Sequence, residues 1–218
     1  MFARHDLIWL SASGWQAACE AAQPEHRAAL EQWQRNDWPA VVRRRDANTF
    51  DNEICAGVPL PPDPDSGNKV RIALRVQALE VIRHMPPLTL KAVLPALPEA
   101  WQELVSALGN RAVGLLIRVY GSAALQALTG QRYLTETSDI DLLFYPISVQ
   151  QLQAGLALLA FHATQLPLDG EIVFPSGQAV AWKEWLQAQQ GDARVLVKEA
   201  DVVHLCATNA LMASFRPS

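Results

Sequence analysis

The sequence lacks several features that would assign it to a broad class at once. Its 218 residues include only three cysteines, an odd and widely spaced set (Cys19, Cys55 and Cys206) with no C-x-x-C pair. This usage argues against a disulfide framework and against a cysteine-based zinc or redox site. We therefore expect three buried thiols in a reducing compartment. The length is sufficient for one large domain or two small ones.

Long apolar runs and a positive net charge are also missing. No stretch approaches the roughly 20 apolar residues of a membrane span, and charges interrupt the opening MFARHDLIWL too often for a signal peptide. With 18 basic and 22 acidic residues, the net charge of -4 has the wrong sign for binding a nucleic-acid backbone. We expect a cytoplasmic protein that has no membrane or nucleic-acid partner.

Several common site motifs are absent as well. The five histidines show neither H-E-x-x-H nor another paired spacing, which makes a histidine-based zinc site improbable. The sequence has no G-x-S-x-G elbow, no G-x-x-x-x-G-K-[ST] loop and no G-x-G-x-x-G fingerprint. Any chemistry must therefore come from a different set of residues.

A proline-rich stretch near the middle, MPPLTLKAVLPALP at 85–98, separates two parts of different texture. Prolines at this density cannot lie in a continuous helix, so we divide the chain into domains 1–90 and 91–218. In the first domain the patterns predict a helical stretch at 15–38 and strands at 40–45 and 69–76. The intervening segment 55–69, rich in proline, aspartate and glycine, is expected to be a long mobile loop.

The second domain alternates predicted helices and strands. The strands are expected at 112–120, 138–146, 170–174 and, as the last one, 193–199, and the helices at 99–110, 122–130, 148–163 and 179–190. This order predicts an α+β fold, a mixed sheet flanked by helices, with a smaller α+β domain before it.

Two carboxylates, Asp139 and Asp141, stand in the apolar predicted strand SDIDLLFYP. Residues i and i+2 of a strand share one face, with Cα atoms about 7 Å apart. Carboxylates held this close in an apolar setting need a cation, and Mg²⁺ prefers such ligands together with phosphate oxygens. In the alternative interpretation Asp139 is a turn residue and Asp141 pairs with an arginine.

Gly121 and Ser122 lie at the end of one predicted strand and the start of a helix. Free backbone N–H groups and the helix dipole favour a phosphate at such a position. Glycine there lets the backbone approach a ligand closely. A phosphate site next to a metal site is therefore the working hypothesis.

The combined pattern, h-G-S followed by D-h-D-h, resembles the nucleotidyltransferase superfamily related to DNA polymerase beta. The resemblance implies that Gly121 and Ser122 hold phosphates and that Asp139 and Asp141 bind metal with a third carboxylate. Glu171 is our choice for that carboxylate over Asp169, although Glu171 could instead be a solvated strand residue. Sixteen residues separate Ser122 from Asp139, more than is common, so TGQRYLTET at 129–137 is expected to form an extra loop that could hold substrate.

A closer resemblance covers nearly the whole chain. The segments that carry it are RHDLIWL, VVRRR, KVRIAL, RVYGSAALQALTGQRYLTETSDIDLL and DGEIVFPSGQAVAWKEW. They are similar to the phosphoribosyl-dephospho-CoA transferases, which are also called malonate decarboxylase holo-acyl-carrier-protein synthases. This resemblance implies attack by a serine of the acyl-carrier subunit of malonate decarboxylase on 2'-(5''-triphosphoribosyl)-3'-dephospho-CoA, with pyrophosphate leaving. Asp139, Asp141 and Glu171 would hold Mg²⁺ and help to deprotonate the serine.

Basic residues must offset the charge that develops on pyrophosphate. The candidates are Arg118, Lys183, Lys198 and the cluster Arg43, Arg44 and Arg45, although most basic residues on such a chain are merely solvated. The role of the polar start, Arg4, His5 and Asp6, stays open. Two alternatives to the carrier-modifying transferase remain: a nucleotidyltransferase that uses an ordinary nucleoside triphosphate, and a non-catalytic nucleotide-binding module.

Overall fold

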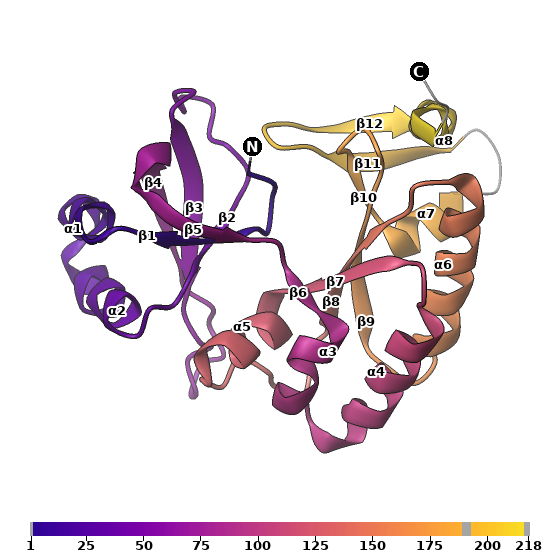
Figure 1. Ribbon diagram of the computed structural model, residues 1–218, viewed down its shortest axis with the longest axis horizontal. Helices are drawn as coiled ribbons and strands as arrows, with labels where there is room; N and C mark the ends of the chain where they lie inside the picture. Colours follow the sequence, from indigo (N-terminus) through magenta and orange to yellow (C-terminus); the bar gives the residue numbers. More distant parts are fainter. Residues whose placement is uncertain (1, 189–192, 216–218) are drawn as a thin grey trace. The chain divides into compact units, whose positions relative to one another are not determined.

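The computed structural model describes residues 2–188 and 193–215. The chain forms two compact units, Met1–Pro87 and Leu88–Ser218, each with its own β-sheet and helices (Figure 1). Across the described residues there are eight α-helices and two mostly antiparallel sheets, which confirms the expected α+β class. None of the described helices is both long and apolar enough to cross a bilayer.

The first unit is built on a five-stranded antiparallel sheet of order β4-β3-β2-β1-β5. Its strands are β1 (Leu7–Leu10), β2 (Ala40–Val42), β3 (Glu53–Pro59), β4 (Arg71–Gln77) and β5 (Val81–Met85), and a short 3-10 turn (Ala78–Glu80) precedes β5. Two helices, α1 (Ala12–Ala21) and α2 (Pro24–Arg35), contact each other, and α1 contacts β4. Leu30 and Trp33 of α2 and Ile8 of β1 are all buried, so both the helices and the sheet of this unit contribute apolar side chains to its interior.

Three expectations for this unit were wrong. The helical stretch 15–38 is two helices, because Pro24 has no N–H to donate and begins a new helix at its first position. The segment 55–69 is not wholly a loop, since β3 runs to Pro59 and buries Cys55, Ala56 and Val58. The strand expected at 40–45 ends at Val42, before the arginines.

The second unit contains a seven-stranded sheet of order β12-β11-β10-β9-β8-β7-β6. Its strands are β6 (Leu88–Thr89), β7 (Leu116–Tyr120), β8 (Ile140–Tyr145), β9 (Leu168–Val173), β10 (Ala179–Ala181), β11 (Arg194–Lys198) and β12 (Val203–Ala207). Neighbouring strands are antiparallel except β8 and β9, which are parallel and joined by helix α6 (Val149–His162). The other helices are α3 (Leu90–Val93), α4 (Glu99–Arg111), α5 (Gly121–Thr129), α7 (Trp182–Ala188) and α8 (Thr208–Met212), with 3-10 turns at Leu94–Ala96 and Ala213–Phe215.

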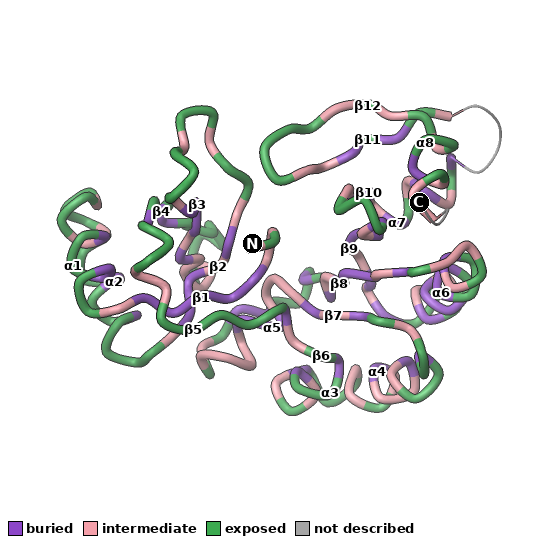
Figure 2. The backbone as a smooth tube through the Cα atoms, turned by 45° about the horizontal axis from the view of Figure 1, so that its top comes forward, coloured by how far each residue is buried: buried purple, intermediate pink, exposed green. Residues whose placement is uncertain are grey.

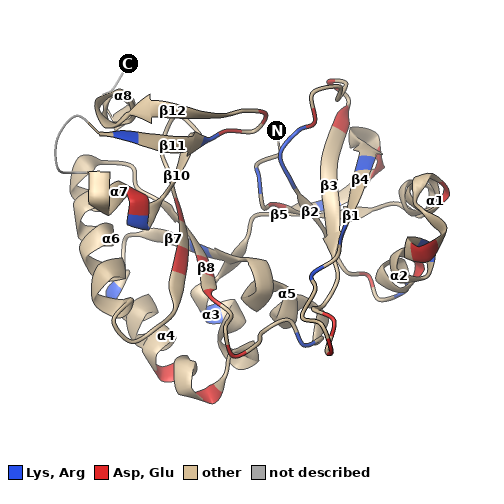
Figure 3. Cartoon of the chain, turned by 180° about the vertical axis from the view of Figure 1, so that it is seen from behind, with Lys and Arg blue, Asp and Glu red and all other residues tan. Residues whose placement is uncertain are grey.

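The two faces of this second sheet differ in chemistry. One face joins residues such as Leu142 and Phe144 of β8 to Leu156 of α6 in a single apolar core, and α3, α4 and α6 lie along it (Figures 1 and 2). Strand alternation turns a different set of side chains to the opposite face. That polar face carries Arg118, Asp141, Asp169, Glu171 and Lys198, and charged positions on the central strands are visible in Figure 3.

The sequence patterns misplaced some elements of this unit. The strand expected last, 193–199, is β11, but β12 follows it at the sheet edge. Residues 179–181 form strand β10 rather than the start of a helix, and the expected helix end at 189–190 lies outside the described residues. Of the three free cysteines only Cys55 is buried, whereas Cys19 and Cys206 are half-buried.

Candidate active site

Gly121, where β7 ends and α5 begins, packs closely against the Asp141 side chain. Tyr120 and Asp141 are cross-strand partners, so the chain turns into α5 directly beside the Asp141 carboxylate. Gly121 has a φ of 67°, a left-handed conformation that favours glycine. A Cβ at this position would overlap Asp141 Oδ2 and lie 3.0 Å from Asp141 Cγ. Glycine is therefore required both by the backbone conformation and by the close approach of the carboxylate.

Asp141 has an acidic neighbour on its other side, Asp169 of β9. The two residues are direct register partners of the parallel pair β8 and β9, so their side chains project from the same face. Gly170, next to Asp169, has a φ of 129°, and a Cβ there would overlap the backbone of Leu142. The glycine thus permits the close approach of the strand that carries Asp169 to the strand that carries Asp141.

Asp139 precedes β8 and is exposed, so it belongs to the loop that leads into the strand. That loop is well packed: Tyr133 and Leu134 are buried, and both backbone N–H groups donate to Gln126 Oε1 at 3.0 Å. Ser138, also buried, closes the loop by accepting a 2.9 Å hydrogen bond from the Thr135 N–H. The loop expected at 129–137 is therefore held against α5 and delivers Asp139 to the entry of β8.

The two carboxylates of β9 each meet a lysine. Lys198 Nζ of β11 lies 2.8 Å from Glu171 Oε1, and Lys183 Nζ of α7 lies 3.5 Å from Asp169 Oδ1. Glu171 has a side chain only 5% exposed, whereas the Asp169 side chain is 46% exposed. The deep and short pair is thus Lys198 with Glu171, and the looser one is Lys183 with Asp169.

Arg118 and Ser122 complete the group of predicted residues that the second unit brings together. Arg118 is half-buried on β7 opposite Leu143, and Leu143 is in turn opposite Glu171 on β9. Ser122 is half-buried at the second position of α5, immediately after Gly121. Backbone N–H groups of this first turn have no partner inside the helix, which is a favourable environment for an anion.

The donor set has the chemistry that Mg²⁺ requires, although it is sparse. No cluster of three or more metal-ligating side chains occurs within residues 2–188 and 193–215. Mg²⁺, however, is commonly bound by one or two carboxylates together with phosphate oxygens and water. The in-register carboxylates of Asp141 and Asp169, next to the start of α5, fit this mode of binding, in which phosphate oxygens and water complete the coordination.

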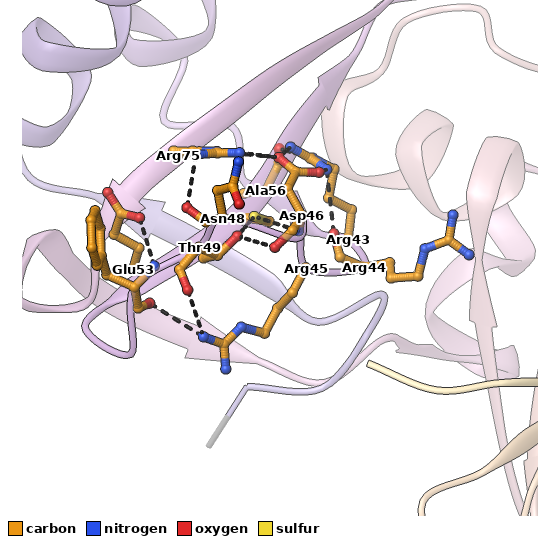
Figure 4. Close-up of polar contacts among 11 residues, drawn as sticks. Arg43, Arg44, Arg45, Asp46, Asn48, Thr49, Glu53, Ala56 and Arg75 are labelled. Atoms are coloured by element: carbon orange, nitrogen blue, oxygen red, sulfur yellow. Dashed lines mark hydrogen bonds and ion pairs between the residues drawn. The ribbon is translucent and has the colours of Figure 1, made fainter. Parts of the chain in front are cut away.

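Arg43 and Arg45 in the first unit serve the loop between β2 and β3 (Figure 4). Arg43 binds both carboxylate oxygens of Asp46, at 2.6 and 2.8 Å, and Arg75 Nη2 reaches the same carboxylate at 3.1 Å. Arg45 donates to the carbonyl oxygens of Thr49 and Phe50 at 3.2 and 3.3 Å. The Arg44 side chain is exposed and extends away from these contacts in Figure 4.

The pH dependence of stability tests the role of Asp46. Hydrogen bonds from Arg43, and then from Arg75, hold the pKa of Asp46 well below its usual value. A carboxyl group with a lowered pKa stabilises the fold above its unfolded pKa of about 3.9, and that contribution is lost as the pH falls below it. Because the side chain is 36% exposed, we expect Asp46→Asn to lower the free energy of unfolding at pH 7 by only about 1–2 kcal/mol.

Urea unfolding at pH 7 and at pH 3 measures this effect. The difference between wild type and Asp46→Asn should shrink at the lower pH. Asp51→Asn is the matched control, because the Asp51 side chain is fully exposed and its Oδ1 lies 3.4 Å from Arg45 Nη2. It should leave the free energy of unfolding close to that of wild type. Equal effects of the two substitutions would contradict the structural role given to Asp46.

The sequence alone did not predict how the carboxylates of β8 and β9 pair with each other and with the lysines. The strand expected at 170–174 left Asp169 outside it, whereas β9 begins at Leu168, so Asp169 and Glu171 share a face. Which residue lies opposite Asp141 depends on strand register. Likewise, Lys183 and Lys198 were candidates for substrate contact, and their carboxylate partners become visible only when β9, α7 and β11 are assembled. The motif Asp-Gly-Glu was the available signal, since its glycine indicates close packing in the middle of a strand.

Comparison with known proteins accounts for both units. Residues 3–87 match the family model "Phosphoribosyl-dephospho-CoA transferase MdcG N-terminal domain", and residues 89–209 match its C-terminal counterpart. The chain belongs to this family. Each match falls within one of the two compact units, so the two family models correspond to the two units of the chain.

Curated relatives of the phosphoribosyl-dephospho-CoA transferase family extend over most of the chain. The phosphoribosyl-dephospho-CoA transferase of Xanthomonas campestris pv. campestris (strain 8004) is 39% identical over 216 residues, covering 97% of either protein. That of Xanthomonas euvesicatoria is 41% identical over 203 residues, covering 91% of each. The Bradyrhizobium diazoefficiens protein of the same name is 34% identical over 207 residues, covering 93% of this chain and 88% of the relative. No solved structure matches the chain significantly.

Proposed function

We propose that this protein transfers the phosphoribosyl-dephospho-CoA group from 2'-(5''-triphosphoribosyl)-3'-dephospho-CoA to a serine of the apo acyl-carrier subunit of malonate decarboxylase. The observation that carries the proposal is the match of both units to the phosphoribosyl-dephospho-CoA transferase family. The close approach of Gly121 to Asp141 adds independent support, because it brings the start of α5, where we propose that phosphate binds, beside a carboxylate of β8.

The proposed reaction exchanges a phosphoanhydride bond for a phosphoester bond. The serine Oγ forms a bond to the α-phosphorus of the donor, the bond from that phosphorus to the oxygen bridging to the β-phosphorus breaks, and pyrophosphate leaves. The serine proton passes to a carboxylate of the site. Such reactions need positioning and charge neutralisation more than covalent help.

Asp141 and its register partner Asp169 would hold Mg²⁺ together with phosphate oxygens, and Asp139, at the entry of β8, would be a further carboxylate near the ion. A bound ion supplies charge neutralisation and lowers the pKa of the attacking hydroxyl. Gly121 and Ser122 would bind phosphate oxygens through the first turn of α5. Arg118 is the cation on β7 for the developing negative charge, and Lys183 is freed for the same purpose if an ion replaces it at Asp169.

Pyrophosphate release with different donors tests the proposal. With the apo carrier subunit and Mg²⁺, we expect release from the triphosphoribosyl donor and none above background from ATP or CTP. Release from ATP or CTP alone would instead identify a nucleotidyltransferase that uses ordinary nucleoside triphosphates. Donor binding without any release, in the presence of the carrier subunit, would identify a non-catalytic module.

A further inference from the structure

The pair of Lys198 and Glu171 spans an intervening strand. Glu171 lies on β9 and Lys198 on β11, with β10 between them. On β10 the register partner of Glu171 is Ala181 and that of Lys198 is Ala179. Two alanines thus leave room for the lysine side chain to cross β10 and place Nζ 2.8 Å from Glu171 Oε1. The contact is built into the sheet and is not a chance encounter of surface side chains.

The burial of the two partners is unequal. The Glu171 side chain is 5% exposed and that of Lys198 is 37% exposed. A carboxylate this deep requires a cation, and Lys198 supplies it. The ammonium carries three N–H donors, one of which Glu171 uses, and the exposed part of Lys198 leaves donors available on the polar face. Glu171 therefore fixes the position of a cation that can still bind an anion.

The position of this cation relates it to the site around Asp141. Glu171 lies two residues beyond Asp169 on β9, and Asp169 is the register partner of Asp141. In the row containing Glu171, Leu143 lies between Glu171 and Arg118. Since adjacent strands are about 4.8 Å apart, the Cα atoms of Arg118 and Glu171 are about 10 Å apart. Arg118 and the fixed Lys198 thus flank the same stretch of the polar face.

We propose that Glu171 is a positioning residue, not a metal ligand, and that it holds Lys198 to contact the two phosphates that leave as pyrophosphate. The proposal rests on the function proposed above for its substrate, but its chemistry needs only a polyphosphate. Asp169, looser and more exposed, remains the carboxylate next to Asp141 for an ion.

Two direct binding measurements separate the roles of Glu171 and Lys198 from those of the aspartates. The first is the affinity for inorganic tripolyphosphate, measured by calorimetry in the absence of the carrier subunit. We expect Lys198→Met to weaken it about tenfold or more and Glu171→Gln by a smaller factor, with the double variant no weaker than Lys198→Met alone. Lys198→Arg, which keeps a cation, should retain most of the affinity. Lys91→Met, at an exposed lysine of α3, is the matched control and should bind like wild type.

The second measurement is the affinity for Mn²⁺, determined by electron paramagnetic resonance in the absence of phosphate. We expect Glu171→Gln and Lys198→Met to bind Mn²⁺ within about twofold of wild type and Asp141→Asn to bind it much more weakly. Loss of Mn²⁺ binding in Glu171→Gln as large as in Asp141→Asn would overturn the proposal. Multiplicative effects of the two substitutions on tripolyphosphate binding would also overturn it, since they would show that Glu171 and Lys198 act independently.

The outcome also distinguishes this inference from the proposed function. If tripolyphosphate binding depends on Lys198 and Glu171 as stated but the carrier subunit is not modified, the function fails and the inference stands. If transfer proceeds and neither substitution changes tripolyphosphate binding or the KM of the donor, the function stands and the inference fails. Thermal unfolding of each variant verifies that it is folded under the assay conditions.

Discussion

Asp141→Asn is expected to reduce transfer by about 10³-fold, which corresponds to roughly 4 kcal/mol of transition-state stabilisation. The substitution keeps the size of the side chain and removes the charge that the proposed site places beside Gly121 and opposite Asp169. Without that charge the ion is held weakly, and the attacking hydroxyl is no longer activated. Steady-state transfer rates at saturating Mg²⁺ measure the effect, and Asp139→Ala should show a loss of similar size.

The loss must be separated from a loss of folding. Asp141 is half-buried at the polar face and does not belong to the apolar core, so Asp141→Asn should leave the unfolding temperature within a few degrees of wild type. Asp201→Asn, in the exposed turn between β11 and β12, is the matched control and should retain full activity. Near wild-type rates for Asp141→Asn at saturating Mg²⁺ would show that the metal site has been assigned to the wrong residue.

Gly121→Ala is expected to lose both activity and stability. The added Cβ would overlap Asp141 Oδ2, so the carboxylate must move, and we expect transfer to fall by about 10²-fold or more. The left-handed φ of 67° adds a backbone cost of about 1–2 kcal/mol for any side chain. Transfer rates and thermal unfolding of the purified variant measure the two effects separately.

Gly130→Ala separates the backbone cost from the overlap. Gly130 follows α5 with a nearly equal φ of 69°, but, apart from its two chain neighbours, no residue has an atom within 4 Å of the position that its Cβ would take. We expect Gly130→Ala to lose similar stability and to keep its activity. Equal activity in the two variants would indicate that the close approach of Gly121 to Asp141 does not matter for the reaction.

Local patterns in the sequence predicted the parts of the site that depend on neighbouring residues. The Gly-Ser pair marked the start of α5, and strand alternation placed Asp141 on the face opposite Ile140 and Leu142. The same pattern wrongly included Asp139 in the strand, whereas Asp139 is exposed in the loop before β8. The α+β class followed from the order of the elements. The close contact of Gly121 with Asp141 did not follow, because it depends on how β7 and β8 pair.

Interactions between distant segments account for most of what the sequence could not supply. The pairing of Lys198 with Glu171 joins residues 27 positions apart through a strand that the sequence patterns had assigned to a helix. Similarly, the three consecutive arginines suggested a polyphosphate site, whereas two of them hold a loop whose carbonyl and carboxylate partners follow β2. The sequence shows where charged residues are, but it does not show whether another residue of the folded chain already pairs with them.

The most direct test of the account is the intact mass of the apo acyl-carrier subunit of malonate decarboxylase after incubation with this protein, Mg²⁺ and triphosphoribosyl-dephospho-CoA. The account predicts a mass gain equal to one phosphoribosyl-dephospho-CoA group with the wild-type protein and no gain with Asp141→Asn. An unchanged mass with the wild-type protein, or a gain of AMP when ATP is the donor instead, would contradict it.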